Sequence, residues 1–187
     1  MRVIGYPEAD LPAGLARQVA ELEARAWPGS TPGHDPALRP RTMLLVDAAG
    51  TVPAALSLLY KPIPLADRTY RAAGLSSVVA LPELRGRGLG GRLVAAARAE
   101  LAADPAVDLA LFSCDRPLAA FYEAAGFDVL PGTVLVGGTP EDPLATDDPG
   151  FDKVVLAAFF TDDPGRDRAA FTGVRVPLHP GNTDRLW

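Results

Sequence analysis

The sequence predicts a single α/β domain with a central, mostly antiparallel mixed sheet flanked by helices. Three observations support this prediction. The chain has 187 residues, which is the length of one domain with a sizeable core. Apolar runs joined by short turn segments fill its first half, as expected for successive antiparallel strands. A glycine-rich turn at residues 85–91 then joins an apolar run to a segment of helical periodicity.

The N-terminal part is expected to contain a short strand at residues 2–6 and one helix. Asp10 is expected to cap the helix, with Pro12 in its first turn. Residues 27–41 contain four prolines and two glycines, so they should form a loop. The helix would cover the sheet with an apolar face formed by Leu15, Val19, Leu22 and Ala26.

Three strands are predicted next, at residues 42–46, 52–60 and 68–80. The tetrapeptide at 47–50 reads as a hairpin turn, and the Lys-Pro-Ile-Pro stretch at 61–64 is expected to break the chain. After the glycine-rich turn, a helix should end at Asp104-Pro105, because proline disfavours helix at the preceding residue. Its apolar row is Leu89, Leu93, Ala97 and Leu101.

The remaining elements are a buried strand at 109–113, a capped helix within 115–127 that closes on Gly126, and a hairpin of 129–136 with 153–160. An acidic, proline-rich insertion is expected at about 138–152 and a C-terminal tail at about 161–187. Residues 174–178 are expected to suit addition to a partner's sheet edge, which would give a homodimer.

Composition restricts the possible partners. The chain has 18 Lys plus Arg against 23 Asp plus Glu, a formal net charge of −5, which argues against nucleic acid and favours cationic ligands. Cys114 is the only cysteine, so an internal disulfide or thiolate cluster is impossible, and His34 and His179 form no recognisable metal pair. No window approaches the ~20 apolar residues of a membrane span. The expectation is a cytoplasmic protein without a metal.

The glycine-rich turn predicts an anion site, because it directs backbone N–H groups and a helix N-terminus toward one point. Gly86-x-Gly88-x-x-Gly91 fits the dinucleotide pattern, but Pro-Glu-Leu-Arg intervenes after the strand and the next strand ends too far on, near Asp115. A purely structural turn is the other alternative. Arg85-x-x-Gly88-x-Gly90 instead fits the pyrophosphate loop of the GNAT acyltransferases.

The chain resembles the GNAT (GCN5-related) N-acetyltransferases in a second signature as well. Asp115, a short helix carrying Tyr122, and then Gly126-Phe127 follow in the expected order, with Asp115 where many members carry Asn. The resemblance implies acetyl-CoA as cosubstrate, with Tyr122 protonating the departing sulfur. It assigns the pantetheine to Val78, Val79 and Ala80, with a further contact from Asp115. It assigns the pyrophosphate to Arg85, Gly86, Arg87, Gly88, Leu89, Gly90 and Gly91.

The general base is not evident from the sequence. Many GNAT members carry a carboxylate on the strand before the turn, whereas residues 75–78 contain none. We expect Ser76 or Ser77 to help order the attacking amine or its proton relay, with Ser76 as the catalytic candidate and Ser77 as the substrate-binding one. By the same resemblance the loop with His34 and Asp35 borders the acceptor site, the alternative being a solvated loop. Cys114 as an acyl-carrying nucleophile is a further alternative, although an apolar strand end usually buries an inert thiol.

The insertion and the tail also resemble the aminoglycoside 2′-N-acetyltransferases. That resemblance places Asp152, Asp184 and the carboxylate of Trp187 against a polycationic sugar, although a solvated loop is the simpler reading of the insertion. The expected function is transfer of an acetyl or short acyl group from acetyl-CoA to an amine of a small, cationic molecule. The alternatives are a non-catalytic acyl-CoA sensor and an acetyltransferase of protein N-termini or lysines.

Overall fold

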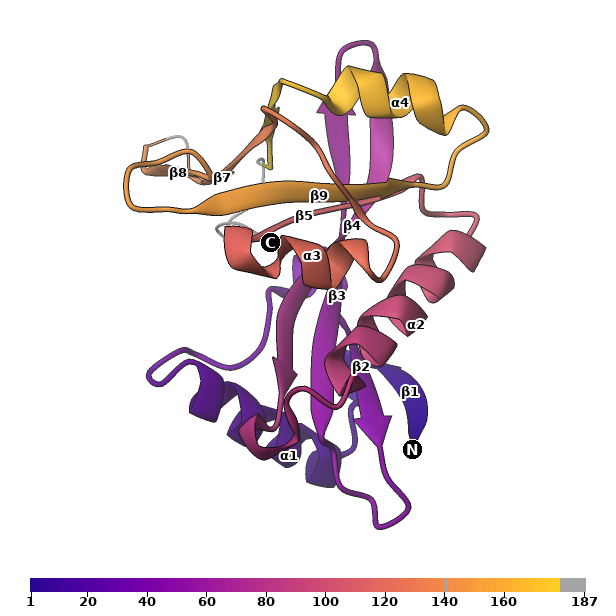
Figure 1. Ribbon diagram of the computed structural model, residues 1–187, viewed down its shortest axis with the longest axis vertical. Coiled ribbons are helices and arrows are strands. Elements are labelled where there is room, and N and C mark those ends of the chain that lie inside the picture. The colour runs from indigo at the N-terminus through magenta and orange to yellow at the C-terminus, as the bar shows by residue number, and fades with distance from the viewer. Residues whose placement is uncertain (140, 179–187) are drawn as a thin grey trace.

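A seven-stranded mixed sheet forms the framework of the computed structural model, which describes residues 1–139 and 141–178 (Figure 1). Its strands, in spatial order, are β1 (Arg2–Pro7), β2 (Arg41–Val46), β3 (Ala54–Leu65), β4 (Arg68–Ala80), β5 (Leu109–Asp115), β9 (Lys153–Phe159) and β6 (Asp128–Val129). Only β4 and β5 pair in parallel within it, and every other neighbouring pair is antiparallel. A smaller sheet has the order β10 (Arg175–Pro177), β7 (Val134–Gly138) and β8 (Pro143–Ala145). The predicted α/β fold with a mostly antiparallel mixed sheet is confirmed.

Helices cover both faces of the large sheet. They are α1 (Ala13–Ala26), α2 (Leu89–Ala103), α3 (Ala119–Glu123) and α4 (Pro164–Phe171), with short 3-10 turns η1 (Glu8–Asp10), η2 (Pro36–Leu38), η3 (Pro82–Leu84) and η4 (Arg116–Leu118). On β2, Met43 packs in the cluster beneath α2, whereas the next residue, Leu44, packs with α1. Because side chains alternate along a strand, α1 and α2 lie on opposite faces.

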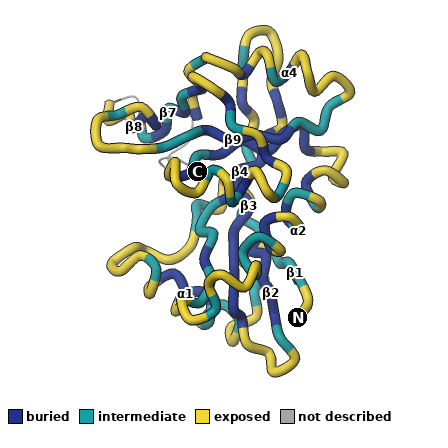
Figure 2. Tube along the Cα trace, viewed as in Figure 1, coloured by how far each residue is buried: buried dark blue, intermediate teal, exposed yellow. Residues whose placement is uncertain are grey.

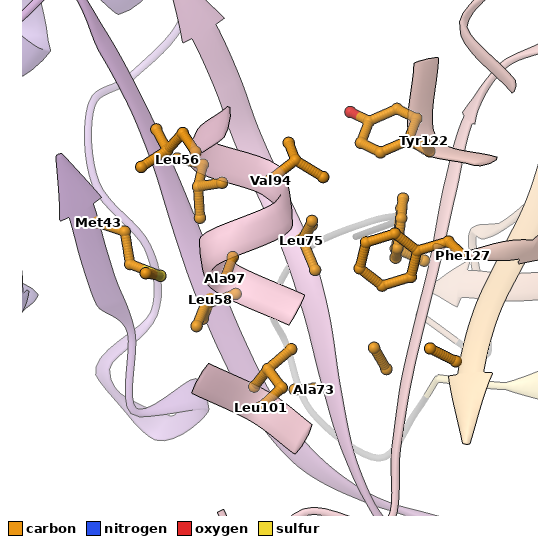
Figure 3. Close-up of a cluster of buried hydrophobic side chains, with 14 of the residues drawn as sticks. Met43, Leu56, Leu58, Ala73, Leu75, Val94, Ala97, Leu101, Tyr122 and Phe127 are labelled. Carbon is orange, nitrogen blue, oxygen red and sulfur yellow. The ribbon is translucent and has the colours of Figure 1, made fainter. Parts of the chain in front are cut away.

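The largest apolar cluster lies between α2 and strands β2 to β5 (Figure 3). The side chains that α2 contributes follow its predicted apolar row, and Leu93, Ala97 and Leu101 are buried. Phe112 on β5 meets the rings of Tyr122 and Phe127 edge to face, with 5.0 Å between ring centroids in each pair. Buried residues follow the strands and exposed ones the loops (Figure 2), so the core fixes the strand ends on which the site is built.

The prediction that residues 61–64 break the chain was wrong. β3 continues to Leu65, and Pro62 and Pro64 lie within it, opposite Arg71 and Thr69 of β4. β2 pairs with β3 only as far as Leu58. The proline half of β3 therefore has a paired neighbour on one side, and such an edge tolerates residues that lack an N–H donor.

The C-terminal strand predictions also need correction. Residues 129–136 do not form one strand, because Val129 ends β6 on β9 and a turn at Gly132, with φ of 71°, leads into β7 of the second sheet. Residues 174–178 were predicted to suit a partner's sheet edge. In the structure β10 pairs in parallel with β7 of the same chain and is an end strand of the smaller sheet. A homodimer formed through this strand stays a prediction.

Two helix starts differ from prediction. Pro12, not Asp10, is the residue before α1, because Asp10 belongs to the separate turn η1. The Asp115 carboxylate accepts no capping hydrogen bond from the following turn and pairs instead with Lys153 at 2.9 Å. Within the described part of the chain, no helix has both the length and the apolar character needed to cross a bilayer.

Candidate active site

A cavity of about 620 Å³ opens where β4 and β5 separate. The two strands pair only at Ala72 with Leu109 and at Ala73 with Ala110, and β5 stays joined to β9 along its whole length while β4 continues to Ala80. Figure 1 shows β5 and β9 crossing the view while β3 and β4 follow its long axis. The cavity is lined by Ala26, Trp27, Val78, Val79, Ala80, Leu84, Arg85, Gly86, Gly88, Leu89, Gly90, Gly91, Leu118, Phe121 and Tyr122.

The glycine-rich turn forms one wall of this cavity. Gly86 and Gly88 have φ values of 76° and 73°, a region that costs most other residues about 1–2 kcal/mol. Gly88 immediately precedes α2, and the first-turn N–H groups of any helix have no acceptor within it. A Cβ on Gly90 would lie 3.3 Å from Phe121 Cζ, so that glycine allows the ring to close over the helix start. The arrangement suits an anion, as predicted.

Most of the predicted cofactor residues converge on this cavity. Val78, Val79 and Ala80 line it from β4, and six residues of the turn line it from the other side. Arg87 is exposed and is not among the lining residues, and Asp115 lies on the surface with its carboxylate 66% exposed.

Tyr122 lies on the opposite wall and is only 6% exposed. Its hydroxyl points away from Phe127 (Figure 3). Burial raises the pKa of Tyr122, and the neighbouring Cys114 and Asp115 add to the effect. The phenol therefore keeps its proton at neutral pH and has it available to donate. Burial also raises the pKa of Cys114 to about 11, so its thiol is protonated and poorly suited to nucleophilic attack.

β4 contains a bulge immediately before the cavity. Ser57 of β3 faces Ser76, but Ala55 faces Val79, so β4 has one residue more than β3 between these pairs. Ser77 has a φ of 50°, which is a strained conformation for a residue with a side chain. Strain of this kind concentrates at functional positions.

Ser76 and His34 are joined by a hydrogen bond. Nε2 of His34 lies 3.2 Å from Ser76 Oγ, and Nδ1 lies 2.7 Å from Glu8 Oε2. The backbone N–H of His34 also donates to Glu8, at 3.0 Å. Burial raises the pKa of Glu8, but the hydrogen bonds and charge of His34 outweigh it, and the net pKa is lowered. Sequence reasoning assigned His34 to the acceptor side but missed Glu8 altogether.

Ser77 and Glu23 line a second, smaller hollow of about 230 Å³. Trp27 lines both this hollow and the cofactor cavity, so the two spaces adjoin. Burial raises the pKa of Glu23 and the charge of Glu8 adds to it, although His34 and a hydrogen bond from Ser77 act in the opposite direction. The sequence offered no signal for Glu23, because glutamate on a surface helix is ordinary.

Replacing Glu23 with glutamine should stabilise the fold at pH 7. Because the pKa of Glu23 is raised above its ordinary value of 4.5, the folded protein resists ionising this group as pH increases from 4.5 to the folded pKa, and stability falls over that window. Glutamine mimics the protonated acid and avoids the loss. We expect a higher Tm than wild type at pH 7 and no difference at pH 4.

The exposed Glu21 on the same helix gives the matched control, and Glu21→Gln should leave Tm unchanged at both pH values. A Glu23→Gln protein less stable than wild type at pH 7 would contradict the argument. It would mean that the favourable interactions of ionised Glu23 with its neighbours outweigh the free-energy cost of burying its charge.

Of the residues predicted to meet a polycationic substrate, Asp152 lies in the described part of the chain, and it does not line the hollow. Asp152 pairs with Arg116 at 2.6 Å in an exposed position between β9 and η4. Asp184 and Trp187 lie outside the described residues. In the described parts of the chain, 1–139 and 141–178, no group of three His, Cys, Asp or Glu side chains is arranged to hold a metal ion.

Comparison with known families decides the classification. The sequence model of the acetyltransferase (GNAT) family matches residues 16–127, which span β2 to β5 and every wall of the cofactor cavity. The chain belongs to the GNAT acetyltransferase family. GNAT enzymes are acyl-CoA-dependent, so the prediction of an acyl-CoA-dependent N-acetyltransferase is confirmed at this level. No curated protein sequence matches the chain.

Solved structures share the GNAT fold. Escherichia coli ElaA has a TM-score of 0.60 at 14% identity, covering 84% of this chain and 99% of that one. An aminoglycoside 6′-N-acetyltransferase complexed with coenzyme A has a TM-score of 0.54 at 16% identity, covering 88% and 99%. Arabidopsis thaliana NAA60 in complex with a bisubstrate analogue has a TM-score of 0.57 at 9% identity, covering 84% and 98%.

Proposed function

We propose that this GNAT enzyme transfers an acetyl group from acetyl-CoA to the amine of a small, cationic molecule. The observation that supports the proposal best is the cavity beside the end of β4, beyond its pairing with β5, which extends from the glycine-rich turn to Tyr122. One end of this cavity suits an anion and the other carries a buried proton donor. Those are the two requirements of a phosphorylated thioester donor.

The donor would lie along β4. The unpaired edge of β4 at Val78, Val79 and Ala80 offers backbone groups for the pantetheine amides, because β5 no longer pairs with it there. The first turn of α2 would hold the pyrophosphate, with the exposed Arg85 and Arg87 near its charges. Asp115, tied to Lys153, is a weaker candidate for a pantetheine contact.

The chemistry needs a neutral amine, support for the developing oxyanion and a proton for the thiolate. A backbone N–H of β4 would support the oxyanion. Tyr122 would supply the proton, because its raised pKa keeps the phenol protonated until the thiolate forms.

The acceptor would enter through the hollow beside Trp27. A buried carboxylate, Glu23, lines this hollow together with Ser77 and the polar Ser30 and Thr31, and such a lining suits an ammonium group. The formal charge of −5 favours the same class of ligand. An aminoglycoside-like compound is one member of that class, and Asp152 and the C-terminal Asp184 and Trp187 would contact its further amines.

Acetylation of protein N-termini or lysines is the second candidate. A lid formed by residues 138–152 would restrict the site to small molecules. β8 of this segment pairs with β7 instead, and none of the segment's described residues lines the hollow. An acceptor side that these residues leave open also admits a peptide.

The test is release of free thiol from acetyl-CoA across a panel of aminoglycosides, polyamines, amino acids and basic peptides, beside a direct titration of acetyl-CoA binding. We expect amine-dependent release with small polyamines or aminoglycosides, and a panel response confined to peptides would favour the second candidate. Binding without release from any amine would support the acyl-CoA sensor, and absence of binding would contradict the cofactor assignment.

A further inference from the structure

The imidazole of His34 is held at both nitrogens inside the protein. Its side chain is only 5% exposed, and its Nδ1 lies 2.7 Å from the carboxylate of Glu8. A carboxylate at this distance fixes the proton on Nδ1. Nε2 is then the acceptor nitrogen, and it faces the Ser76 hydroxyl at 3.2 Å. The carboxylate, imidazole and hydroxyl therefore form a directed chain that carries protons away from Ser76.

Ser76 lies between this buried chain and the reacting region. It is half-buried and precedes the bulge that leads into Val78–Ala80 on the cavity wall. Ser76 and Val78 are two residues apart across the bulge, which is at most about 7 Å of chain, so an amine attacking a thioester beside Val78 comes within reach of the Ser76 hydroxyl. Ser77 and Gly33, the neighbours of Ser76 and His34, both line the acceptor hollow.

From this geometry we propose that His34 accepts the proton of the incoming ammonium group through the hydroxyl of Ser76, with Glu8 holding the imidazole. The inference rests on the proposed acetyl transfer and supplies the base that the β4 sequence lacks. Ser76 contacts the substrate, whereas Glu8 is a positioning residue.

The protons balance over one turnover. The substrate ammonium gives one proton to Ser76 Oγ as the serine passes its own to His34 Nε2, and the imidazolium later releases that proton to solvent. The neutral amine then forms the C–N bond, and the C–S bond breaks as the tetrahedral intermediate collapses. As the intermediate collapses, Tyr122 gives its proton to the coenzyme A thiolate. The amine nitrogen then loses its second proton, which returns to Tyr122.

Charged groups from several elements surround the imidazole. Glu8 from η1 and Glu23 from α1 both interact with it electrostatically. The cationic side chains of an adjoining cavity of about 510 Å³ oppose the effect of these two carboxylates. One of these cations, Arg41, is already paired with Glu100. The ionisable groups that line this cavity with His34 are Glu8, Arg39, Arg41 and Tyr60.

The test compares pH profiles of kcat/KM for the full chain, with acetyl-CoA and the best amine of the panel. His34→Gln and Ser76→Ala should each lose about 100-fold at pH 7, and the loss should shrink to a few-fold near pH 9.5, where free amine is abundant. Ser76→Thr keeps a hydroxyl and should retain most activity. Glu8→Gln should fall between these variants, and Glu21→Gln on the exposed face of α1 should match wild type.

Acetyl-CoA affinity and Tm, measured on every variant, separate this mechanism from a structural role. Unchanged kcat/KM in both Ser76→Ala and His34→Gln would overturn the inference while leaving the acetyltransferase intact. So would a loss equal at all pH values and accompanied by weaker acetyl-CoA binding. Acetylated Ser76 trapped by mass spectrometry without amine would replace the relay with a covalent route. A wild-type protein that binds acetyl-CoA but turns over no amine would overturn both proposals.

Discussion

Tyr122→Phe should lower kcat for amine acetylation by about 10²–10⁴-fold, the usual contribution of a positioned proton donor. Tyr122 lines the cofactor cavity, and burial raises the pKa of its phenol, which keeps the hydroxyl protonated. Phenylalanine keeps the ring contacts with Phe112 and Phe121 but leaves the departing thiolate to solvent. Acetyl-CoA affinity should stay within a few-fold of wild type, which a binding titration beside steady-state kinetics will check.

The matched control is Tyr70→Phe, which also removes one buried hydroxyl. Tyr70 donates to Asp167 at 2.9 Å in the region of α4, away from the cofactor cavity, so the variant should lose about 1 kcal/mol of stability and keep its kcat. If Tyr122→Phe retained a kcat within about threefold of wild type, solvent would be the proton source and the assignment of Tyr122 would fail.

Phe112→Ala should destabilise the fold by about 3–5 kcal/mol, as expected for a large aromatic truncated in a packed core. Phe112 is 1% exposed and contacts two rings edge to face, so its loss leaves a cavity and removes two aromatic pairs. Because one of these rings is Tyr122, kcat should fall as well. Urea denaturation followed by fluorescence gives the free energy of unfolding, with kcat measured below the transition.

Phe151 provides the comparison, since it is 40% exposed and lies before β9. Phe151→Ala should change stability by no more than about 0.5 kcal/mol. A loss below about 1 kcal/mol in Phe112→Ala would mean that the core around β5 collapses to fill the space, and that Tyr122 is positioned by other contacts.

The parts of the fold that local sequence determines could be predicted. The turn before α2 and the helix itself follow from glycine spacing and an i+4 apolar row, and both are found where expected. Proline in β3 was misjudged because its tolerance depends on β2 ending early at Leu58, which is a property of the sheet. The second sheet was missed because a single glycine turn redirects residues 129–136 from one sheet to the other.

The candidate site likewise has one part that local sequence predicts and another part that it does not. The cofactor wall comes largely from one continuous segment, so family signatures could identify it. The Glu8–His34–Ser76 chain joins residues separated by 26 and 42 positions, and nothing in the local pattern of any of the three indicates the other two. Only the packing of the loop after α1 over β4 brings them together.

The extra residue in β4 also determines on which face of the sheet each later side chain of that strand lies. Before it, Leu75 packs in the α2 cluster; after it, Val78 and Ala80 pack against the same cluster and Val79 against α1. A chain shorter by this one residue would send Val79 to the α2 face and Val78 and Ala80 to the α1 face. The donor-binding edge and the Ser76 hydroxyl would then no longer hold their present positions relative to each other. An insertion or deletion of one residue here should therefore abolish activity rather than reduce it.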